Sequence, residues 1–323
     1  MKQIIQSARS GELSVKTVPA PRANKGEILV QTHSSVISAG TERLVVNFAK
    51  KNLISKAKNR PDLVKKVLNK AKTDGIRTTI EAVMARLDNP IPLGYSAAGT
   101  VISVGPELEG RFQNGQRVAI AGAGIANHAE INSVPANLAT PIPEGVTDDE
   151  AAFGTVGAIA LHAVRNLDAK IGEVVAIFGA GIIGQIAAQL LRLSGVRALV
   201  LDYDETRLDL AQKLGAEKCY NLAEHNIKNN IISITGGIGC DGILIAAATD
   251  SNEPFIMAAT IARDRAKVCM VGMSGTEFPY AEFMKKEMSI IISRSYGPGR
   301  YDEDYEQRGI KYPLGFIRWT ETE

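Results

Sequence analysis

Three closely spaced glycines follow an apolar run in the second half of the chain. The run, residues 174–178, is typical of a buried strand in a parallel sheet. Gly179 permits a tight turn after it, Gly181 lets the backbone approach a pyrophosphate, and Gly184 lets the next helix pack closely on the strand. The N-terminus of that helix would supply N–H donors and the positive end of a dipole. We therefore predict that a dinucleotide binds to Gly179, Ala180, Gly181, Ile182, Ile183 and Gly184.

A carboxylate stands where such a site needs one. The apolar residues 198–201 end at Asp202, 18 residues after Gly184, which is close to the spacing of an acid that accepts a hydrogen bond from the ribose 2′-hydroxyl. This carboxylate would repel a 2′-phosphate, so the pattern favours NAD over NADP. Arg207 weakens that preference, unless it is only a surface residue of a helix over residues 204–214. The alternative to the whole motif is a glycine-rich turn in a domain that has lost its ligand.

Few other side chains have the type and spacing of a catalytic group. His33 and His128 ionise near neutral pH, but a surface or core role is the favoured interpretation of His33. Arg300 would suit an anionic group of a substrate, although a solvated loop residue is the favoured interpretation there too.

The cysteines have no catalytic spacing. Cys219, Cys240 and Cys269 fit neither a zinc knuckle nor a CxxC redox pair, and residues 1–218 contain no cysteine. Their apolar surroundings predict buried free thiols.

The elements that position the glycine motif alternate between strands and helices. Strands are expected near residues 173–178, 198–202, 241–247, 267–271 and 289–293, mostly with helices between them. This alternation predicts a doubly wound parallel sheet. The first half of the chain differs. Short strands are expected in the first 40 residues and over 99–134, with helical spacing over 44–88 and a helix of small residues over 151–164.

Composition sets limits on function. The chain has 323 residues, 45% of them hydrophobic, and a net charge of +2, which suits two globular domains and gives no sign of nucleic-acid binding. No apolar run approaches the roughly 20 residues that span a bilayer, and the N-terminus lacks a signal core, so we expect a cytoplasmic protein. Residues 41–90 hold 12 Lys or Arg against 5 Asp or Glu. They indicate either a surface that faces anions or, as favoured, the solvated face of amphipathic helices.

The order of these parts resembles the medium-chain dehydrogenase/reductase family, and the resemblance covers nearly the whole chain. The resemblance implies an α/β fold with a GroES-like, mainly β catalytic domain at 1–150, in which 44–88 is a Lys-rich helical insertion. A Rossmann NAD-binding domain is implied at 151–293, and 294–323 would return toward the catalytic domain. The residues that carry the resemblance are 38–42, 93–99, 114–118, 158–163 and 179–215.

Zinc-containing members of that family carry Cys, His and Glu ligands that this sequence lacks. By position, Ala39 replaces the first cysteine, Tyr95 and Ser96 replace the His–Glu pair, and Thr155 falls near the third ligand. The resemblance therefore implies a zinc-independent member with no metal site. In place of a metal, hydrogen-bond donors must stabilise a developing alkoxide, and Thr41 and Tyr95 are the candidates. Turn formation by Thr41 and packing by Tyr95 are the alternatives.

A narrower resemblance concerns the end of the chain. Residues 295–301 and 312–319 are similar to the N-terminal half of bacterial bi-domain oxidoreductases of polysaccharide biosynthesis. Compared with those proteins, the segment that returns toward the catalytic domain stops early, after Trp319. We therefore expect the chain to be a piece of a longer protein. The resemblance implies a second oxidoreductase domain or a second copy of the chain as partner, and a sugar or nucleotide-sugar as substrate.

Two functions follow from these observations. The first is an NAD(H)-dependent oxidoreductase that transfers a hydride to or from an alcohol or carbonyl substrate. The second is a non-catalytic NAD(H)-binding module that docks a partner oxidoreductase domain. The retained Thr41 and the glycine motif favour the first, and the lack of a strong acid–base signature favours the second. Neither nucleic acid nor a membrane is expected as a partner.

Overall fold

The computed structural model describes residues 1–8, 10–40, 42, 46, 89–108 and 110–320. Thr41 and, apart from Val46, the expected helical insertion at 44–88 lie outside these residues. The chain divides into two compact units, one of Met1–Thr155 with Gln307–Gly309 and one of Val156–Glu306 with Ile310–Glu323. Among the described residues, no helix is both long and apolar enough to cross a bilayer.

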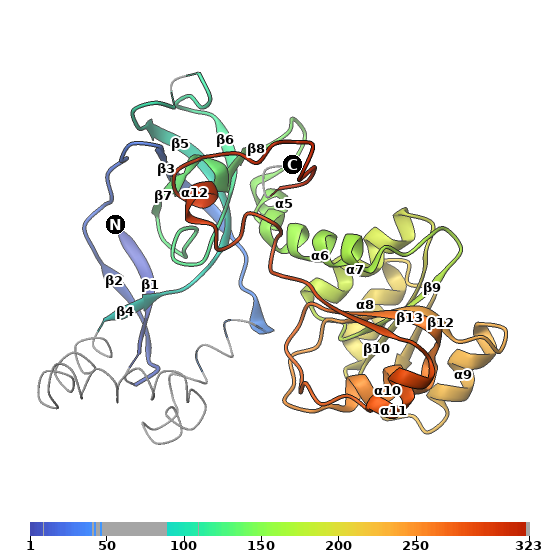
Figure 1. The fold of residues 1–323 in the computed structure, drawn as a ribbon. Coiled ribbons are helices and arrows are strands. Elements are labelled where there is room, and N and C mark those ends of the chain that lie inside the picture. Colours follow the sequence, from blue (N-terminus) through green and yellow to red (C-terminus); the bar gives the residue numbers. More distant parts are fainter. Residues whose placement is uncertain (9, 41, 43–45, 47–88, 109, 321–323) are drawn as a thin grey trace, which may run out of the picture. The chain divides into compact units, whose positions relative to one another are not determined.

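The first unit is built from antiparallel strands (Figure 1). A five-stranded sheet has the order β7-β3-β5-β6-β8, and a three-stranded sheet has the order β2-β1-β4. The inward residues of the larger sheet, among them Ile28, Val30 and Val118, are fully buried. The elements are β1 (Lys2–Ser7), β2 (Leu13–Thr17), β3 (Glu27–Ser35), β4 (Pro90–Pro92), β5 (Ser96–Val104), β6 (Arg117–Ala121), β7 (Ile131–Pro135), η1 (Ala136–Leu138), β8 (Ala139–Pro141) and α5 (Asp148–Ala151).

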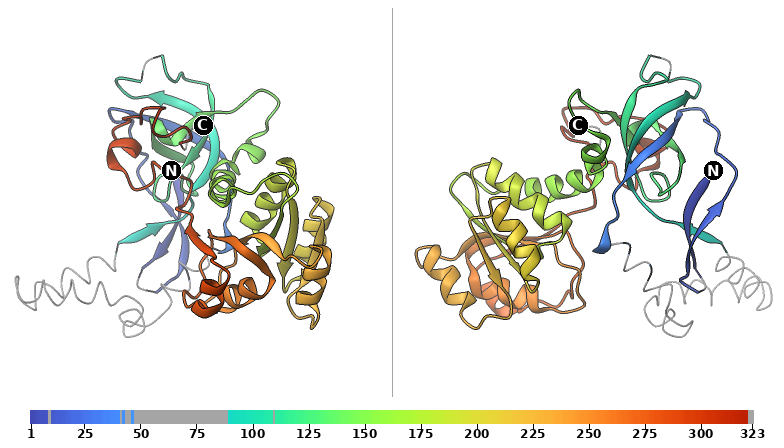
Figure 2. Two further views of the ribbon diagram at one scale, coloured as in Figure 1. Left: turned by 45° about the vertical axis from the view of Figure 1, so that its right-hand side comes forward. Right: turned by 180° about the vertical axis from the view of Figure 1, so that it is seen from behind.

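The second unit is a six-stranded parallel sheet in the order β11-β10-β9-β12-β13-β14, with helices on both faces (Figures 1 and 2). The buried core strand β9 (Val174–Phe178) turns alternate side chains to opposite faces. The strands are β10 (Arg197–Asp202), β11 (Lys218–Asn221), β12 (Cys240–Ile245), β13 (Ala262–Met270) and β14 (Ser289–Ile292). The helices are α6 (Gly154–Leu167), α7 (Ile182–Leu193), α8 (Glu205–Lys213), α9 (Ile227–Ile234), α10 (Glu253–Ile261), α11 (Tyr280–Lys285) and α12 (Glu303–Glu306).

Alternation along β9 divides the core of this unit in two. Ala176 and Phe178 belong to a hydrophobic cluster with residues of α9, α10 and α11. Val175 and Ile177 belong to a second cluster with residues of α6, α7 and α8. A strand that is buried on both faces is apolar along its whole length, which explains the uninterrupted run in the sequence. The predicted fold class is confirmed.

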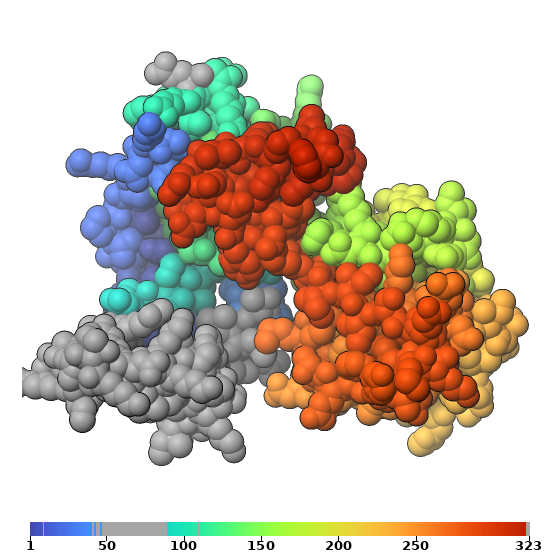
Figure 3. Space-filling model, viewed as in Figure 1, coloured from blue at the N-terminus to red at the C-terminus, as the bar shows by residue number. Residues whose placement is uncertain are grey.

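The C-terminal segment after residue 294 contains few regular elements and lies at the surface (Figure 3). The ring of Trp319 lies between two guanidinium groups of the second unit. The carbon atoms of the Arg165 and Arg318 groups are each 3.9 Å from the ring centroid. The cation–π contact with Arg165 stabilises the position of the Trp319 ring on α6.

Candidate functional site

The turn after β9 requires glycine at its first position. Gly179 has φ of +100°, a conformation that side chains disfavour. A Cβ there would lie 2.8 Å from the backbone nitrogen of Ala247. The N–H of Gly179 donates to the carbonyl of Leu201 at 2.8 Å, so the turn begins while the chain is still bonded to the neighbouring strand.

The other two glycines differ in what surrounds them. A Cβ on Gly184 would lie 1.9 Å from the carbonyl oxygen of Gly179, so only glycine lets α7 start this close to the strand. Around Gly181 a Cβ would meet no described atom within 4 Å. Gly181 is the N-cap of α7, makes no side-chain cap, and has no acidic residue in the turn that follows. Open space in front of an uncapped helix N-terminus suits an anionic pyrophosphate.

The C-terminal end of α7 fixes the direction in which the helix leaves the site. The N–H of Gly195 donates to the carbonyl of Arg192, and the N–H of Val196 donates to that of Leu191. With Gly195 at φ of +75°, these two bonds form a Schellman motif.

Asp202 ends β10 beside the glycine turn. Its Oδ2 accepts a hydrogen bond from the N–H of Ala180 at 2.7 Å, and its Oδ1 accepts from the N–H of Asp204 at 3.0 Å. The side chain is 12% exposed. An ionised carboxylate has about four acceptor positions, so Asp202 can hold the turn in place and still accept from a ribose hydroxyl.

Arg207 lies on α8, close to this carboxylate. Its Nη1 is 3.8 Å from Oδ2 of Asp202, and its Nε is 3.5 Å from Oδ2 of Asp204. The side chain is 55% exposed. The guanidinium is therefore within reach of a group that binds at Asp202, and it balances part of the negative charge there.

Two of the residues at the expected metal positions use their hydroxyls in hydrogen bonds with backbone groups. Ser96 Oγ donates to the carbonyl of Ala152 at 2.6 Å and accepts from the N–H of Thr155 at 3.3 Å. Thr155 Oγ1 donates to the carbonyl of Ile120, also at 3.3 Å. Both residues are buried. Their hydroxyls connect β5 and β6 to Ala152 and to the first turn of α6, which is a structural role.

The remaining two positions also fail to supply zinc ligands. The side chain of Ala39 has no atom that could bind a metal, and Tyr95 is half-buried and offers only a phenol. Across the part of the chain that the structure describes, no three His, Cys, Asp or Glu side chains form a group that could hold a metal ion. Zinc prefers thiolate, imidazole and carboxylate ligands, so the side chains at these positions do not fit it.

The histidines have different environments. His33 Nδ1 lies 2.8 Å from Oδ2 of Asp148 and is 40% exposed, which is a surface ion pair. His162 lies on α6, where burial and the nearby charges of Arg294 and Arg165 lower its pKa. His128 is buried and bonded to both Ser35 and Glu42. The sequence analysis did not anticipate that arrangement.

The cysteines are free thiols, as expected. Burial raises the pKa of Cys240 and of Cys269 to about 12, and that of the half-buried Cys219 to about 11. Thiols with such pKa values carry almost no thiolate at neutral pH, so none of them is poised as a nucleophile.

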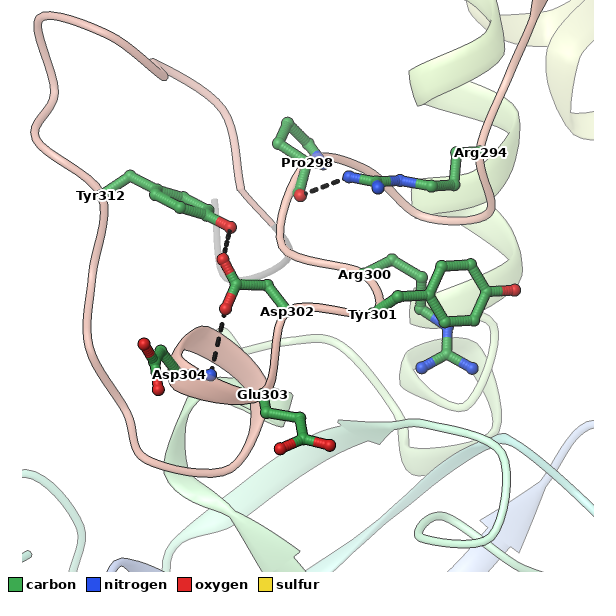
Figure 4. A pocket seen from close by; sticks show the side chains of 8 residues that line it. All are labelled: Arg294, Pro298, Arg300, Tyr301, Asp302, Glu303, Asp304 and Tyr312. Atoms are coloured by element: carbon green, nitrogen blue, oxygen red, sulfur yellow. Dashed lines mark hydrogen bonds between the residues drawn. The ribbon is translucent and has the colours of Figure 1, made fainter.

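A surface pocket of about 450 Å³ lies in the C-terminal part of the second unit. Figure 4 shows Arg294 and Arg300 among the side chains that line it. Arg294 donates to the carbonyl of Pro298 at 2.6 Å. Arg300 forms an ion pair at 3.0 Å with the buried Glu306, which also accepts from the hydroxyl of Tyr296. These contacts give Arg300 a structural role in this segment. The lining also includes Tyr301, Asp302, Glu303, Asp304 and Tyr312.

Known proteins show similarity to this chain in sequence and in fold. A family model described as zinc-binding dehydrogenase matches residues 183–308. An L-threonine 3-dehydrogenase of Marinomonas sp. (strain MWYL1) is 29% identical over an alignment of 246 residues, and the match covers 67% of this chain and 70% of that protein.

Two of the solved structures that are similar to this chain contain a nicotinamide cofactor. A short chain alcohol dehydrogenase from E. coli CFT073, complexed with NADH, has a TM-score of 0.70 and 22% identity, and the match covers 91% of this chain and 83% of that one. A mycobacterial protein complexed with NADPH has a TM-score of 0.69 and 19% identity, covering 92% and 82%. At these identities the likeness establishes the fold.

Proposed function

We propose that the chain is a medium-chain dehydrogenase/reductase and, on that premise, an NAD(H)-dependent oxidoreductase that works without zinc. It transfers a hydride to or from an alcohol or carbonyl carbon. The observation that carries the proposal is the turn from β9 into α7. There Gly179 and Gly184 are enforced by close backbone contacts, whereas Gly181 faces open space.

The chain's own residues divide the work of binding and catalysis. When bound, the nicotinamide supplies or accepts the hydride. The N-terminus of α7 binds the pyrophosphate, and Asp202 orients the ribose through its hydroxyl. Tyr95 donates a hydrogen bond to the substrate oxygen as negative charge develops there, and Thr41 is the second candidate for this role. A sugar derivative is the substrate class that we favour.

Cofactor choice provides the first test. NAD(H) is expected to bind more tightly than NADP(H), because the Asp202 carboxylate repels a 2′-phosphate. Asp202→Ala should narrow the ratio of the two dissociation constants, and calorimetry with both cofactors measures it. Asp209→Ala on the exposed side of α8 removes the same charge farther along the helix and should leave the ratio unchanged. Equal binding of NADP(H) to the wild type would refute the assignment of Asp202.

Metal content provides the second test. Protein prepared without a histidine tag is expected to contain far less than one zinc per chain, because Ala39, Tyr95 and Thr155 stand where zinc ligands would be needed. Elemental analysis after dialysis against a chelator measures this. A zinc ion that is present in one copy per chain and survives the chelator would contradict the proposal.

The second candidate function is a non-catalytic NAD(H)-binding module that docks a partner oxidoreductase domain. It is favoured because the hydroxyls of Ser96 and Thr155 are already hydrogen-bonded to the backbone, which leaves few free groups for chemistry. The two functions differ in one observable. A catalytic chain oxidises its bound NADH in a single turnover when a suitable carbonyl compound is added, and a docking module does not.

A further inference from the structure

A chain of three hydrogen-bonded side chains lies within the first unit, apart from the dinucleotide site. Ser35 Oγ is 2.8 Å from Nδ1 of His128, and Nε2 of the same ring is 3.1 Å from Oε2 of Glu42. The side chain of His128 is 6% exposed and that of Glu42 is 12% exposed, whereas Ser35 is half-buried. Both nitrogens of a buried imidazole are thus occupied, one by an acid and the other by an alcohol.

The carboxylate determines which ring nitrogen carries the hydrogen. Ionised Glu42 can only accept hydrogen bonds, so Nε2 of His128 is the donor. Nδ1 of the neutral ring then accepts from the hydroxyl of Ser35. The other carboxylate oxygen of Glu42 accepts from the N–H of Ser38 at 2.9 Å, which fixes its orientation. An acid, a base and a hydroxyl in this order make the hydroxyl oxygen a better proton acceptor, by the logic of activated nucleophiles.

His128 packs against the segment that contains Tyr95. Its backbone N–H donates to the carbonyl of Leu93 at 2.7 Å. A Cβ on Gly94 would lie 2.7 Å from the same nitrogen, so the two segments are in direct backbone contact. The base of the hydrogen-bonded chain therefore lies next to the segment whose tyrosine we assign to the substrate oxygen.

The two ends of the hydrogen-bonded chain, Ser35 and Glu42, lie near the two residues that we assign to the substrate oxygen, Tyr95 and Thr41. Ser35 is paired with Ala97 across β3 and β5, two residues beyond Tyr95. Glu42 directly follows Thr41. Ser35 is only partly buried and carries the hydroxyl at the end of the chain of hydrogen bonds, so it is the member that we assign to contact with the substrate.

We infer that Ser35, His128 and Glu42 form a proton relay for the hydride transfer proposed above, on which this inference rests. In alcohol oxidation the substrate O–H bond breaks as the hydride leaves the carbon for the nicotinamide. The substrate proton passes to Ser35 Oγ, and the proton of Ser35 passes to Nδ1 of His128. Glu42 keeps its negative charge and stabilises the imidazolium. The ring later returns its proton to solvent through Ser35, and carbonyl reduction runs the same transfers in reverse.

The same three groups could also activate Ser35 for attack on an acyl group, but the surrounding backbone disfavours that use. Acyl transfer needs N–H donors for an oxyanion beside the nucleophile. The N–H of Val36, the residue after Ser35, is already bonded to the carbonyl of Ser96 at 3.0 Å. Ser35 is the last residue of β3 and is paired with Ala97 of β5, so it lies in extended backbone rather than on a sharp turn. Proton transfer is therefore the chemistry that the geometry favours.

The kinetic test uses Ser35→Ala and His128→Gln, with a substrate identified from a carbonyl panel. Each change is expected to lower turnover by about 10²-fold, the lower end of what general acid–base catalysis contributes. NADH affinity should remain that of the wild type. The double variant should be no slower than either single variant, because the groups act as one unit. Ser35→Thr keeps a hydroxyl and should recover most of the activity.

A matched control is His33→Gln, since His33 lies on the same strand but forms a surface pair with Asp148. This variant should turn over like the wild type. Single variants that keep wild-type turnover, losses that multiply in the double variant, or labelling of Ser35 by a fluorophosphonate would each overturn the relay and leave the proposed function standing. A wild type that oxidises NADH with no carbonyl of the panel would instead overturn the proposed function, and the relay with it.

A second readout does not depend on turnover. Nitrogen-15 NMR of the imidazole in the protein without substrate should show the neutral tautomer of His128 with its hydrogen on Nε2. Glu42→Gln should reduce that preference, because an amide can donate as well as accept. A wild-type ring with its hydrogen on Nδ1 would contradict the order of donors on which the relay depends.

Discussion

Tyr95→Phe is expected to lower turnover by about 10²- to 10³-fold, because removing one donor to a developing oxyanion typically has that effect. Tyr95 is half-buried, and the family resemblance implies that it replaces a ligand of zinc-containing members. Since Tyr95 and the glycine turn belong to different units, the affinity for NADH should remain that of the wild type. Stopped-flow turnover with the identified substrate and calorimetry with NADH give the two numbers.

A suitable control for this variant is another tyrosine whose side chain is largely exposed. Tyr203→Phe, at a residue that is 65% exposed, removes a hydroxyl of the same kind and should change neither number. If Tyr95→Phe turns over like the wild type, Tyr95 has a packing role. Thr41 would then be the next donor to test.

The second large effect concerns the glycine turn. Gly184→Ala would place a methyl group 1.9 Å from the carbonyl oxygen of Gly179, which forces α7 away from β9. We expect a loss of about 3 kcal/mol in the free energy of unfolding, the upper end of typical overpacking costs. Denaturant unfolding of the protein without cofactor measures it.

Gly181→Ala is the matched variant, with the same added methyl group in open space. Its unfolding free energy should stay within about 1 kcal/mol of the wild type, as expected for an exchange at an uncapped N-cap. Its affinity for NADH should fall roughly 10- to 100-fold, because the methyl group meets the incoming pyrophosphate. Equal NADH affinity of Gly181→Ala and the wild type would mean that the pyrophosphate does not bind at this turn.

Most of the parallel sheet was predictable because its strands are buried on both faces. An uninterrupted apolar run of only five residues with glycine directly after it, as in β9, favours a buried strand over a helix. The sequence analysis missed β11, whose four residues include only two apolar side chains. Pairing with β10 makes this segment a strand. The start of β13 was also missed, because the polar residues Arg263 and Asp264 interrupt its apolar pattern. An ion pair of Arg263 with Asp241 at 2.6 Å stabilises this part of the strand.

The candidate site was predictable only where its parts are contiguous. The glycine motif and Asp202 have fixed spacing within one βαβ unit, so the chain order alone indicates them. Ser35 and Glu42, in contrast, lie 93 and 86 positions from His128, and no sequence pattern connects them. Only the pairing of β3 with its neighbours brings them together. The hydroxyls of Ser96 and Thr155 were named as replacements for ligands, but their bonds to the backbone depend on the fold.

The most direct test of NAD(H)-dependent hydride transfer without zinc is a single-turnover experiment on protein dialysed against a chelator. The protein is loaded with one equivalent of NADH, its zinc content is measured, and a panel of carbonyl compounds that includes keto-sugars is added. We predict that at least one compound removes the nicotinamide absorbance and yields the alcohol in equal amount, with far less than one zinc per chain. Oxidation that appears only after stoichiometric zinc is restored, or with no compound of the panel, would contradict the proposal.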